Sequence, residues 1–258
     1  MTDILIPLPS RGFDPTEVAV PWKVLTGLGH DVHFTTPSGD VGEVDSKMLD
    51  GNGLGILKPV LMARRDAVEA YHEMTACSAF QSPVAYSALK DDDYSGLLLP
   101  GGHDKPVREY LESEVLQLFV ATFFSMKKPV GAICHGVVLM ARCISTETGK
   151  SILHGYKTTA LLEKQEKLAF NMTRLWLGDY YLTYPGKTVE GEVRAALAEQ
   201  SDFQEGPPPM LRDSPEKMGR GYTVLDRHYL SARWPGDAYS FSVAFDALLK
   251  NTNKALAS

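Results

Sequence analysis

The segment PVGAICHGVVL, residues 129–139, decides the fold of this chain. It begins with small and β-branched residues, which are typical of a buried strand, and reaches Cys134 just before a run that favours helix. A tight turn between a strand and a helix holds its central residue in a strained backbone conformation. We therefore predict that Cys134 lies between a strand over Pro129–Ile133 and a helix over Gly136–Arg142.

Strands and helices alternate along most of the chain. Short apolar runs predict strands over Asp3–Leu8, Asp31–Thr36 and Tyr94–Leu99. A helix between the first two makes a strand-helix-strand unit, which implies a parallel sheet with right-handed crossovers. The prediction is an α/β fold, a doubly wound sandwich with a mainly parallel central sheet and extra helical decoration. Further helices are predicted over residues 15–27, 63–79, 111–126, 161–177 and 239–249, a strand over 222–225, and loops over 39–59 and 201–221.

Composition narrows the class of protein. The 258 residues are 44% hydrophobic and 22% charged, as expected of one large α/β domain. A net charge of −6 without a basic block argues against a nucleic-acid partner, and the apolar runs are too short to span a membrane. The N-terminus lacks the pattern of a secretory signal, so we expect a cytoplasmic protein.

The cysteines argue against structural crosslinks. Cys77, Cys134 and Cys143 form an odd set without a Cys-x-x-Cys motif. Neither a disulfide framework nor a zinc site is indicated, and we expect no metal and no cofactor.

Cys134 is the first candidate for chemistry. The N-terminus of the following helix carries a partial positive charge, which lowers the pKa of a nearby thiol and favours the reactive thiolate. We therefore expect an acidified sulfur at the sheet edge that solvent-borne molecules can reach. The alternative is a buried cysteine with a purely structural role.

The segment LLPGGHD, residues 98–104, follows another predicted strand. Parallel strands open on the same edge of a sheet, where ligands bind, so this segment is expected near Cys134. Adjacent glycines would let backbone N–H groups face an oxyanion there. A simple turn is the alternative, since two glycines are a weak signal.

Glu17 has two possible roles. Asp14 and Pro15 predict a helix start, and Glu17 three residues after Asp14 fits a capping box. Yet Glu17 follows the first strand by a short loop, on the same sheet edge as Cys134. A carboxyl shielded from water beside a thiol has a raised pKa and can act as an acid or a base. The local pattern favours the cap.

Two motifs together resemble a known family. PGGH at residues 100–103, followed some thirty residues later by AICHG at 132–136, resembles the ThiJ/PfpI superfamily. EVAVP at 17–21 and SARWPG at 231–236 are similar to its glutamate segment and its C-terminal signature. The resemblance implies the flavodoxin-like sandwich of class I glutamine amidotransferases, as one domain over 1–258 with a lid-like insertion around 160–221. Asp104 departs from the pattern, because the family continues with glycine there.

The resemblance also implies roles for particular residues. Cys134 would be the nucleophile, and Glu17 a protonated carboxyl that hydrogen-bonds the sulfur and carries a proton. His135 would pair with an acid in a Cys-His-Asp/Glu triad. Glu166 has the better spacing for that acid, although Glu163 also follows the Gly-x-x-Thr segment.

The same resemblance suggests the groups that would bind the substrate. Gly102 and the backbone at His135 would donate to an oxyanion, and His103 would line the substrate site.

The implied function is an enzyme acting on small electrophiles. In the closest branch, a glutathione-independent glyoxalase converts methylglyoxal to lactate. The alternatives are an isocyanide hydratase, or a stress protein that senses oxidants or holds unfolded clients without catalysis. Homodimers are common in the superfamily, so a homodimer is expected.

Overall fold

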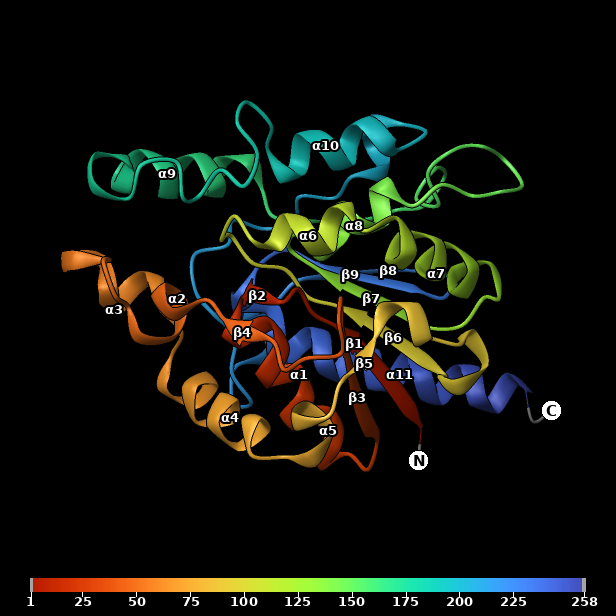
Figure 1. Ribbon diagram of the computed structural model, residues 1–258. Coiled ribbons are helices and arrows are strands. Elements are labelled where there is room, and N and C mark those ends of the chain that lie inside the picture. The colour runs from red at the N-terminus through yellow and green to blue at the C-terminus, as the bar shows by residue number, and fades with distance from the viewer. Residues whose placement is uncertain (1, 257–258) are drawn as a thin grey trace.

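A seven-stranded sheet lies at the centre of the computed structural model, which describes residues 2–256 (Figure 1). Its order is β5-β3-β1-β6-β7-β9-β8, and only the β8–β9 pair is antiparallel. This is the predicted doubly wound sheet. The strands are β1 Asp3–Pro7, β3 Asp31–Thr36, β5 Val84–Ala85, β6 Gly96–Leu99, β7 Val130–Ile133, β8 Thr223–Asp226 and β9 Tyr229–Ala232; β2 Arg11–Phe13 and β4 Glu43–Val44 form a separate pair.

Helices cover both faces of the sheet (Figure 1). On one face lie α1 Pro15–Gly27 and α11 Ala238–Leu256, with α4 Arg65–Thr75 packed against α1. On the other face lie α6 Val107–Glu112, α7 Glu114–Ser125 and α8 Gly136–Arg142. An outer layer of α9 Glu163–Leu177 and α10 Val189–Ala196 packs on α8 through α10. The short helices are α2 Ser46–Asp50, α3 Lys58–Leu61 and α5 Ser78–Gln81.

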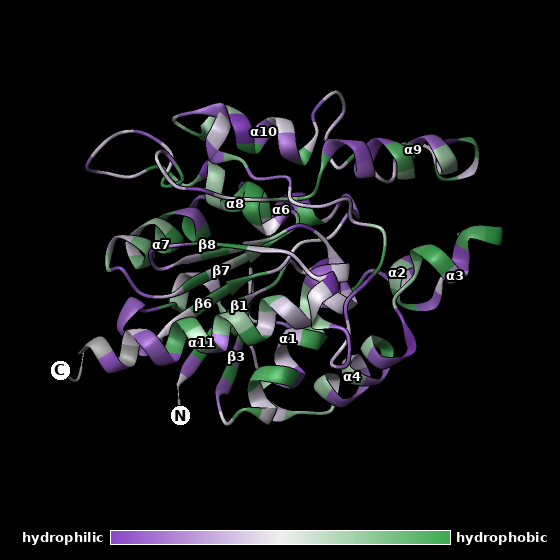
Figure 2. Cartoon of the chain, turned by 180° about the vertical axis from the view of Figure 1, so that it is seen from behind, coloured by the Kyte–Doolittle hydropathy of each residue, from purple (hydrophilic) through white to green (hydrophobic). Residues whose placement is uncertain are grey.

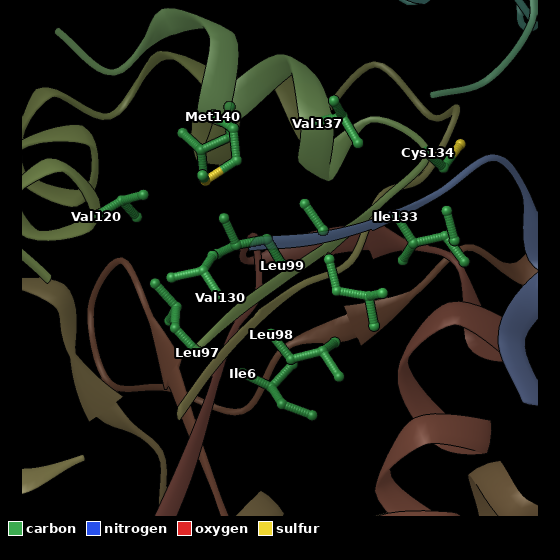
Figure 3. Close-up of a cluster of buried hydrophobic side chains, with 14 of the residues drawn as sticks. Ile6, Leu97, Leu98, Leu99, Val120, Val130, Ile133, Cys134, Val137 and Met140 are labelled. Atoms are coloured by element: carbon green, nitrogen blue, oxygen red, sulfur yellow. The ribbon is translucent and has the colours of Figure 1, made fainter. Parts of the chain in front are cut away.

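The hydrophobic pattern explains these layers. The central strands β6 and β7 are buried throughout because helices cover both of their faces, so they are apolar without alternation. Their aliphatic side chains pack together with those of β1 and α8 (Figure 3). The surrounding helices carry hydrophobic and hydrophilic residues on opposite faces, as the alternating colours along α4 and α10 show (Figure 2). No helix among residues 2–256 is long and apolar enough to cross a bilayer.

The strand order positions the functional edge. The chain reverses direction across the sheet between β1 and β6, and ligands of doubly wound sheets bind outside the carboxyl ends of the strands at such a point. Glu17 follows β1, Gly101 follows β6 and Cys134 follows β7. Three segments that are distant in sequence therefore meet at one edge.

The structure differs from the predicted elements in several places, and the helix predicted over 63–79 is divided into α4 and α5. The predicted loop over 39–59 contains α2, which begins because the Asp45 side chain accepts a hydrogen bond from the backbone of Lys47. The predicted helix over 111–126 is two helices, since Ser113 caps a new one by accepting from Leu116. Strands β2, β4, β5 and β9 and helix α10 were not predicted at all. All are short, and the strands have two to four residues each.

Candidate active site

Cys134 occupies a strained turn between β7 and α8. Its φ of 56° lies in the left-handed region, which a residue with a side chain rarely adopts, as predicted for this position. Its backbone N–H donates to the carbonyl of Ala232 over 3.2 Å, and its carbonyl accepts from Val137 over 3.2 Å. The sulfur points away from the aliphatic side chains of the core (Figure 3). The turn therefore directs the thiol toward the functional edge.

The glycine after His135 makes this turn possible. A Cβ atom at Gly136 would overlap the backbone carbonyl of Leu99 at the end of β6. A Cβ atom at Gly101 would lie 2.6 Å from the backbone nitrogen of His135. The segments that follow β6 and β7 thus approach each other closely. This approach places Gly101 beside the elbow, the turn of Cys134 and His135 between β7 and α8.

Glu17 faces the thiol and not the helix start. Its carboxylate accepts a hydrogen bond from the backbone N–H of Gly101 over 2.7 Å and also hydrogen-bonds the Cys134 side chain. The capping interpretation is wrong, because the backbone N–H of Asp14 donates to the Gly101 carbonyl and not to Glu17. Asp14 alone caps the helix, by accepting from Thr16 and Glu17. The Glu17 carboxyl is therefore available to interact with the Cys134 sulfur.

Burial favours the protonated forms of both the thiol and this carboxyl. Burial raises the pKa of Glu17 well above its usual value, and the nearby Asp14 raises it further. Burial also raises the pKa of the Cys134 thiol, and the Glu17 charge acts in the same direction. Cys134 is 1% exposed. The expectation of an acidified sulfur within reach of solvent is wrong for this closed arrangement, so the thiol needs a base.

His135 is placed to be that base. Its Nδ1 lies 3.4 Å from the Cys134 sulfur, and its Nε2 lies 2.8 Å from the hydroxyl of Thr183. The Thr183 hydroxyl donates to the His103 carbonyl over 3.2 Å, so it accepts from Nε2–H. That bond assigns the proton to Nε2 and leaves the Nδ1 lone pair facing the thiol. Burial lowers the pKa of His135 well below its usual value, which keeps the ring neutral and able to accept a proton.

Glu166 does not contact His135. Its carboxylate accepts from the backbone of Val189 over 2.9 Å, and Thr183 occupies the partner position on the imidazole. The predicted triad contact is therefore not formed in this structure. Glu166 and His135 nevertheless line the same small cavity. Burial raises the pKa of Glu166 to about 7.

Replacing Glu166 with glutamine is expected to change how stability depends on pH. The carboxyl has a folded-state pKa of about 7 against 4.5 as the reference, so its contribution is complete below 4.5 and is lost as the pH rises through 7. The stability advantage of the wild type over Glu166→Gln should fall by roughly 3 kcal/mol between these limits. Urea unfolding across pH 4–8 measures this difference. A difference that stays constant, or that falls equally for the exposed Glu147→Gln control, would contradict the assignment.

Gly102 and His103 lie at the same edge. A Cβ atom at Gly102 would lie 2.6 Å from the carbonyl oxygen of Gly12, so the position admits no side chain. Among the hydrogen bonds of residues 2–256, the backbone N–H of Gly102 meets no protein acceptor. The His103 ring packs edge-on against the His135 ring at 5.0 Å between centroids. Burial lowers the pKa of His103 to about 4, so this ring is neutral as well.

Sequence reasoning missed two residues of this site. Thr183 lies 48 positions after His135 in an irregular segment, where no motif marks it. Asp14 was identified only as a cap, although it is 3% exposed and its charge acts on both Glu17 and Cys134. Within residues 2–256, no group of three or more His, Cys, Asp or Glu side chains is arranged to hold a metal ion.

Comparisons with known proteins agree with this architecture. An uncharacterised protein of Schizosaccharomyces pombe is 28% identical over 123 residues, which are 47% of this chain and 45% of that protein. The matched stretches span less than half of the curated relatives' own length.

Solved structures match over nearly the whole chain. Rapid Encystment Protein 24 KDa of Francisella tularensis is 15% identical with a TM-score of 0.70, covering 96% of this chain and 99% of that one. Glyoxalase III from Candida albicans is 17% identical with a TM-score of 0.67, covering 96% and 97%. At these identities the likeness shows a shared fold.

The family itself is shown by a direct match. The sequence model of the family described as ThiJ/PfpI family-like matches residues 8–207, which include the elbow and the Gly-Gly-His segment. This chain belongs to the ThiJ/PfpI-like family.

Proposed function

We propose that this chain is a cysteine-dependent lyase that converts methylglyoxal to lactate without glutathione. The observation that carries the proposal is the placement of the Cys134 sulfur, which hydrogen-bonds Glu17 and lies 3.4 Å from Nδ1 of His135. A nucleophile flanked by a neutral base and a neutral acid suits an addition followed by proton transfers. The fold shared with glyoxalase III from Candida albicans is consistent with this chemistry.

The first step forms a hemithioacetal. The sulfur bonds to the aldehyde carbon, the thiol proton passes to Nδ1 of His135, and the aldehyde oxygen takes the Glu17 proton. Glu17, now a carboxylate, removes the hydrogen from that carbon while His135 returns its proton to the ketone oxygen. The product is an enediol bonded to sulfur, and all three groups remain in place for the next step.

The second half releases the product. Glu17 donates its proton to the former ketone carbon and His135 takes the proton of the other hydroxyl, which leaves a lactoyl thioester on Cys134. Water then attacks the thioester carbon, gives one proton to Glu17, and the sulfur leaves with the proton from His135. Methylglyoxal and water thus become lactic acid without any oxidant. The free N–H of Gly102 is the proposed donor to the oxyanion of this last step.

Access to the sulfur requires the site to open. Cys134 and His135 are each 1% exposed, and Thr183, in the segment beyond α9, contacts the His135 ring. We propose that the insertion around 160–221 acts as a lid, since it supplies this segment. Substrate would enter when the bond between Thr183 and His135 breaks.

The test is lactate production by the purified protein. Protein freed of added thiol reductants is incubated with methylglyoxal in the absence of glutathione, and lactate is measured by mass spectrometry. The expected result is turnover that depends on protein concentration. Lactate no greater than that formed by the Cys134→Ser protein would overturn the proposal.

Two alternatives, an isocyanide hydratase and an oxidant sensor, have different expectations. Hydration of an isocyanide would use the same thiol and carboxyl, so a parallel assay that yields an N-formyl product would favour it. An oxidant sensor relies on a thiolate, and the raised pKa of Cys134 opposes that role in the closed state. A homodimer and a cytoplasmic location stay predictions from the sequence.

A further inference from the structure

Buried hydrogen-bond donors without partners gather near the sheet edge that carries Cys134. Within residues 2–256, the hydroxyl of Tyr181, Nη1 of Arg212 and Nε1 of Trp234 are buried atoms with no hydrogen-bond partner. Tyr181 is only 4% exposed. Folded proteins leave few buried polar groups unpaired, because each one has lost its hydrogen bonds to water. The concentration of three such donors at one edge therefore points to a ligand.

Tyr181 is connected to the elbow through a chain of rings. The Tyr181 ring lies 5.0 Å from the His103 ring, which in turn lies 5.0 Å from the His135 ring. His135 contacts the Cys134 sulfur. Only the His103 ring therefore lies between Tyr181 and His135, the base of the proposed reaction.

Trp234 lies near the elbow on the side of β9. It follows β9 by two residues, and Ala232 at the end of β9 accepts the hydrogen bond from the Cys134 backbone over 3.2 Å. Trp234 is partly buried and packs against the core, and its indole nitrogen can only donate.

Arg212 completes the set from the irregular segment before β8. Its Nη2 donates to the carbonyl groups of Val60 and Leu61, both over 3.2 Å, and its guanidinium carbon lies 5.8 Å from the centre of the Trp234 ring. Those bonds hold the guanidinium in place while Nη1 stays unpaired. Its electrostatic neighbours are Asp14, the ion pair of Arg64 with Asp66, and Tyr181. Arg212, which belongs to the insertion around 160–221, therefore holds its cation beside Trp234 and near Asp14, the residue that caps the helix carrying Glu17.

The chemistry of these groups selects a ligand. Guanidinium and indole N–H groups donate hydrogen bonds and accept none, so the ligand must supply acceptor oxygens. The positive charge of Arg212 favours an anion, and a carboxylate matches its planar geometry. The buried Asp14 carboxyl beside Arg212 disfavours a second negative charge on the ligand, which argues for a carboxylate over a phosphate dianion.

We propose that the substrate is an α-oxoaldehyde that also carries a carboxylate, with the aldehyde at Cys134 and the carboxylate at Arg212, Trp234 and Tyr181. This inference rests on the proposed function for the reaction of the aldehyde at Cys134. It adds a second site, which recognises the carboxylate at the other end of the substrate. For such a substrate, 4,5-dioxopentanoate, the same proton transfers and one water yield 2-hydroxyglutarate. No oxidant or reductant enters the balance.

The experiment compares two substrates on matched variants. Wild-type protein should show a kcat/KM for 4,5-dioxopentanoate about 30-fold above that for methylglyoxal, the range expected of a charge-assisted hydrogen bond. Arg212→Gln should lower this ratio at least tenfold, mainly through KM, and Trp234→Phe should lower it in the same direction. Arg220→Gln removes an exposed charge of the same segment and should leave the ratio unchanged. Equal use of both substrates by the wild type would overturn the inference.

A binding measurement separates the two proposals. In Cys134→Ser protein, 4-oxopentanoate should raise the melting temperature, whereas its uncharged methyl ester should not. One outcome is that neither dicarbonyl is turned over, yet 4-oxopentanoate still stabilises the protein selectively. If Tyr181→Phe and Arg212→Gln each abolish that stabilisation, the anion site stands and the lyase proposal fails. If the acid and the ester shift the melting temperature equally, the anion site is refuted even where methylglyoxal is a substrate.

Discussion

Replacement of Cys134 with serine is expected to lower kcat/KM for methylglyoxal by about 10⁴-fold or more, since losses of this size follow removal of a covalent nucleophile. The serine hydroxyl is a much weaker nucleophile than sulfur, and the neighbouring His135 is too weak a base to ionise it. The fold should be unaffected, because the two side chains are similar in size. Initial rates of lactate formation measure the effect.

Cys77 gives the matched control for this substitution. It is a partly buried cysteine that precedes α5 and lies outside the proposed site. Cys77→Ser should retain turnover within about twofold, as surface substitutions away from a site usually do. A Cys134→Ser protein that keeps more than a tenth of the activity would contradict the assigned nucleophile.

Replacement of Gly136 with alanine is expected to lower the free energy of unfolding by about 3 kcal/mol or more, in the upper range of overpacking substitutions. The added Cβ would overlap the backbone carbonyl of Leu99, and β6 cannot yield without disturbing its pairing with β1 and β7. The strained backbone at Cys134 should relax at the same time. Urea denaturation measures the free energy of unfolding, and the rate of lactate formation shows whether the elbow keeps its active geometry.

Gly27 provides the control for glycine replacement. It is the last residue of α1, and a Cβ there would meet nothing within 4 Å. Gly27→Ala should be neutral or slightly stabilising, because alanine favours helix by about 1 kcal/mol over glycine. Equal decreases in the free energy of unfolding for Gly27→Ala and Gly136→Ala would show that the close approach of β6 and α8 does not make Gly136 special.

Much of the fold could be predicted because the signals are local. The run into Cys134 combines a buried strand, a turn and a helix within eleven residues, and the structure has β7 and α8 where the prediction placed them. Helix α1 likewise begins after Asp14, whose side chain caps it as the sequence suggested. The misses are elements whose signals are tertiary: β9 is only four residues long and is recognised by its pairing with β7 and β8.

The candidate site was harder to predict, since protonation and contact depend on burial. Helix-dipole reasoning gave Cys134 a lowered pKa, yet burial and Glu17 dominate and raise it. Glu17 matches a capping box by spacing, but the close approach of Gly101 directs its carboxyl to the sulfur. Spacing along the chain also favoured Glu166 over Thr183, because a segment without regular structure carries no signal of where it will lie.

The central claim is that the Cys134 sulfur carries the substrate during turnover, and mass spectrometry of the acid-quenched reaction tests it most directly. Protein mixed with methylglyoxal and stopped within the first turnover is digested and mapped. The account predicts a lactoyl group on the peptide that contains Cys134, which appears before free lactate and is absent from the Glu17→Gln protein. Lactate formed at full rate with no acyl group on Cys134 would contradict the account.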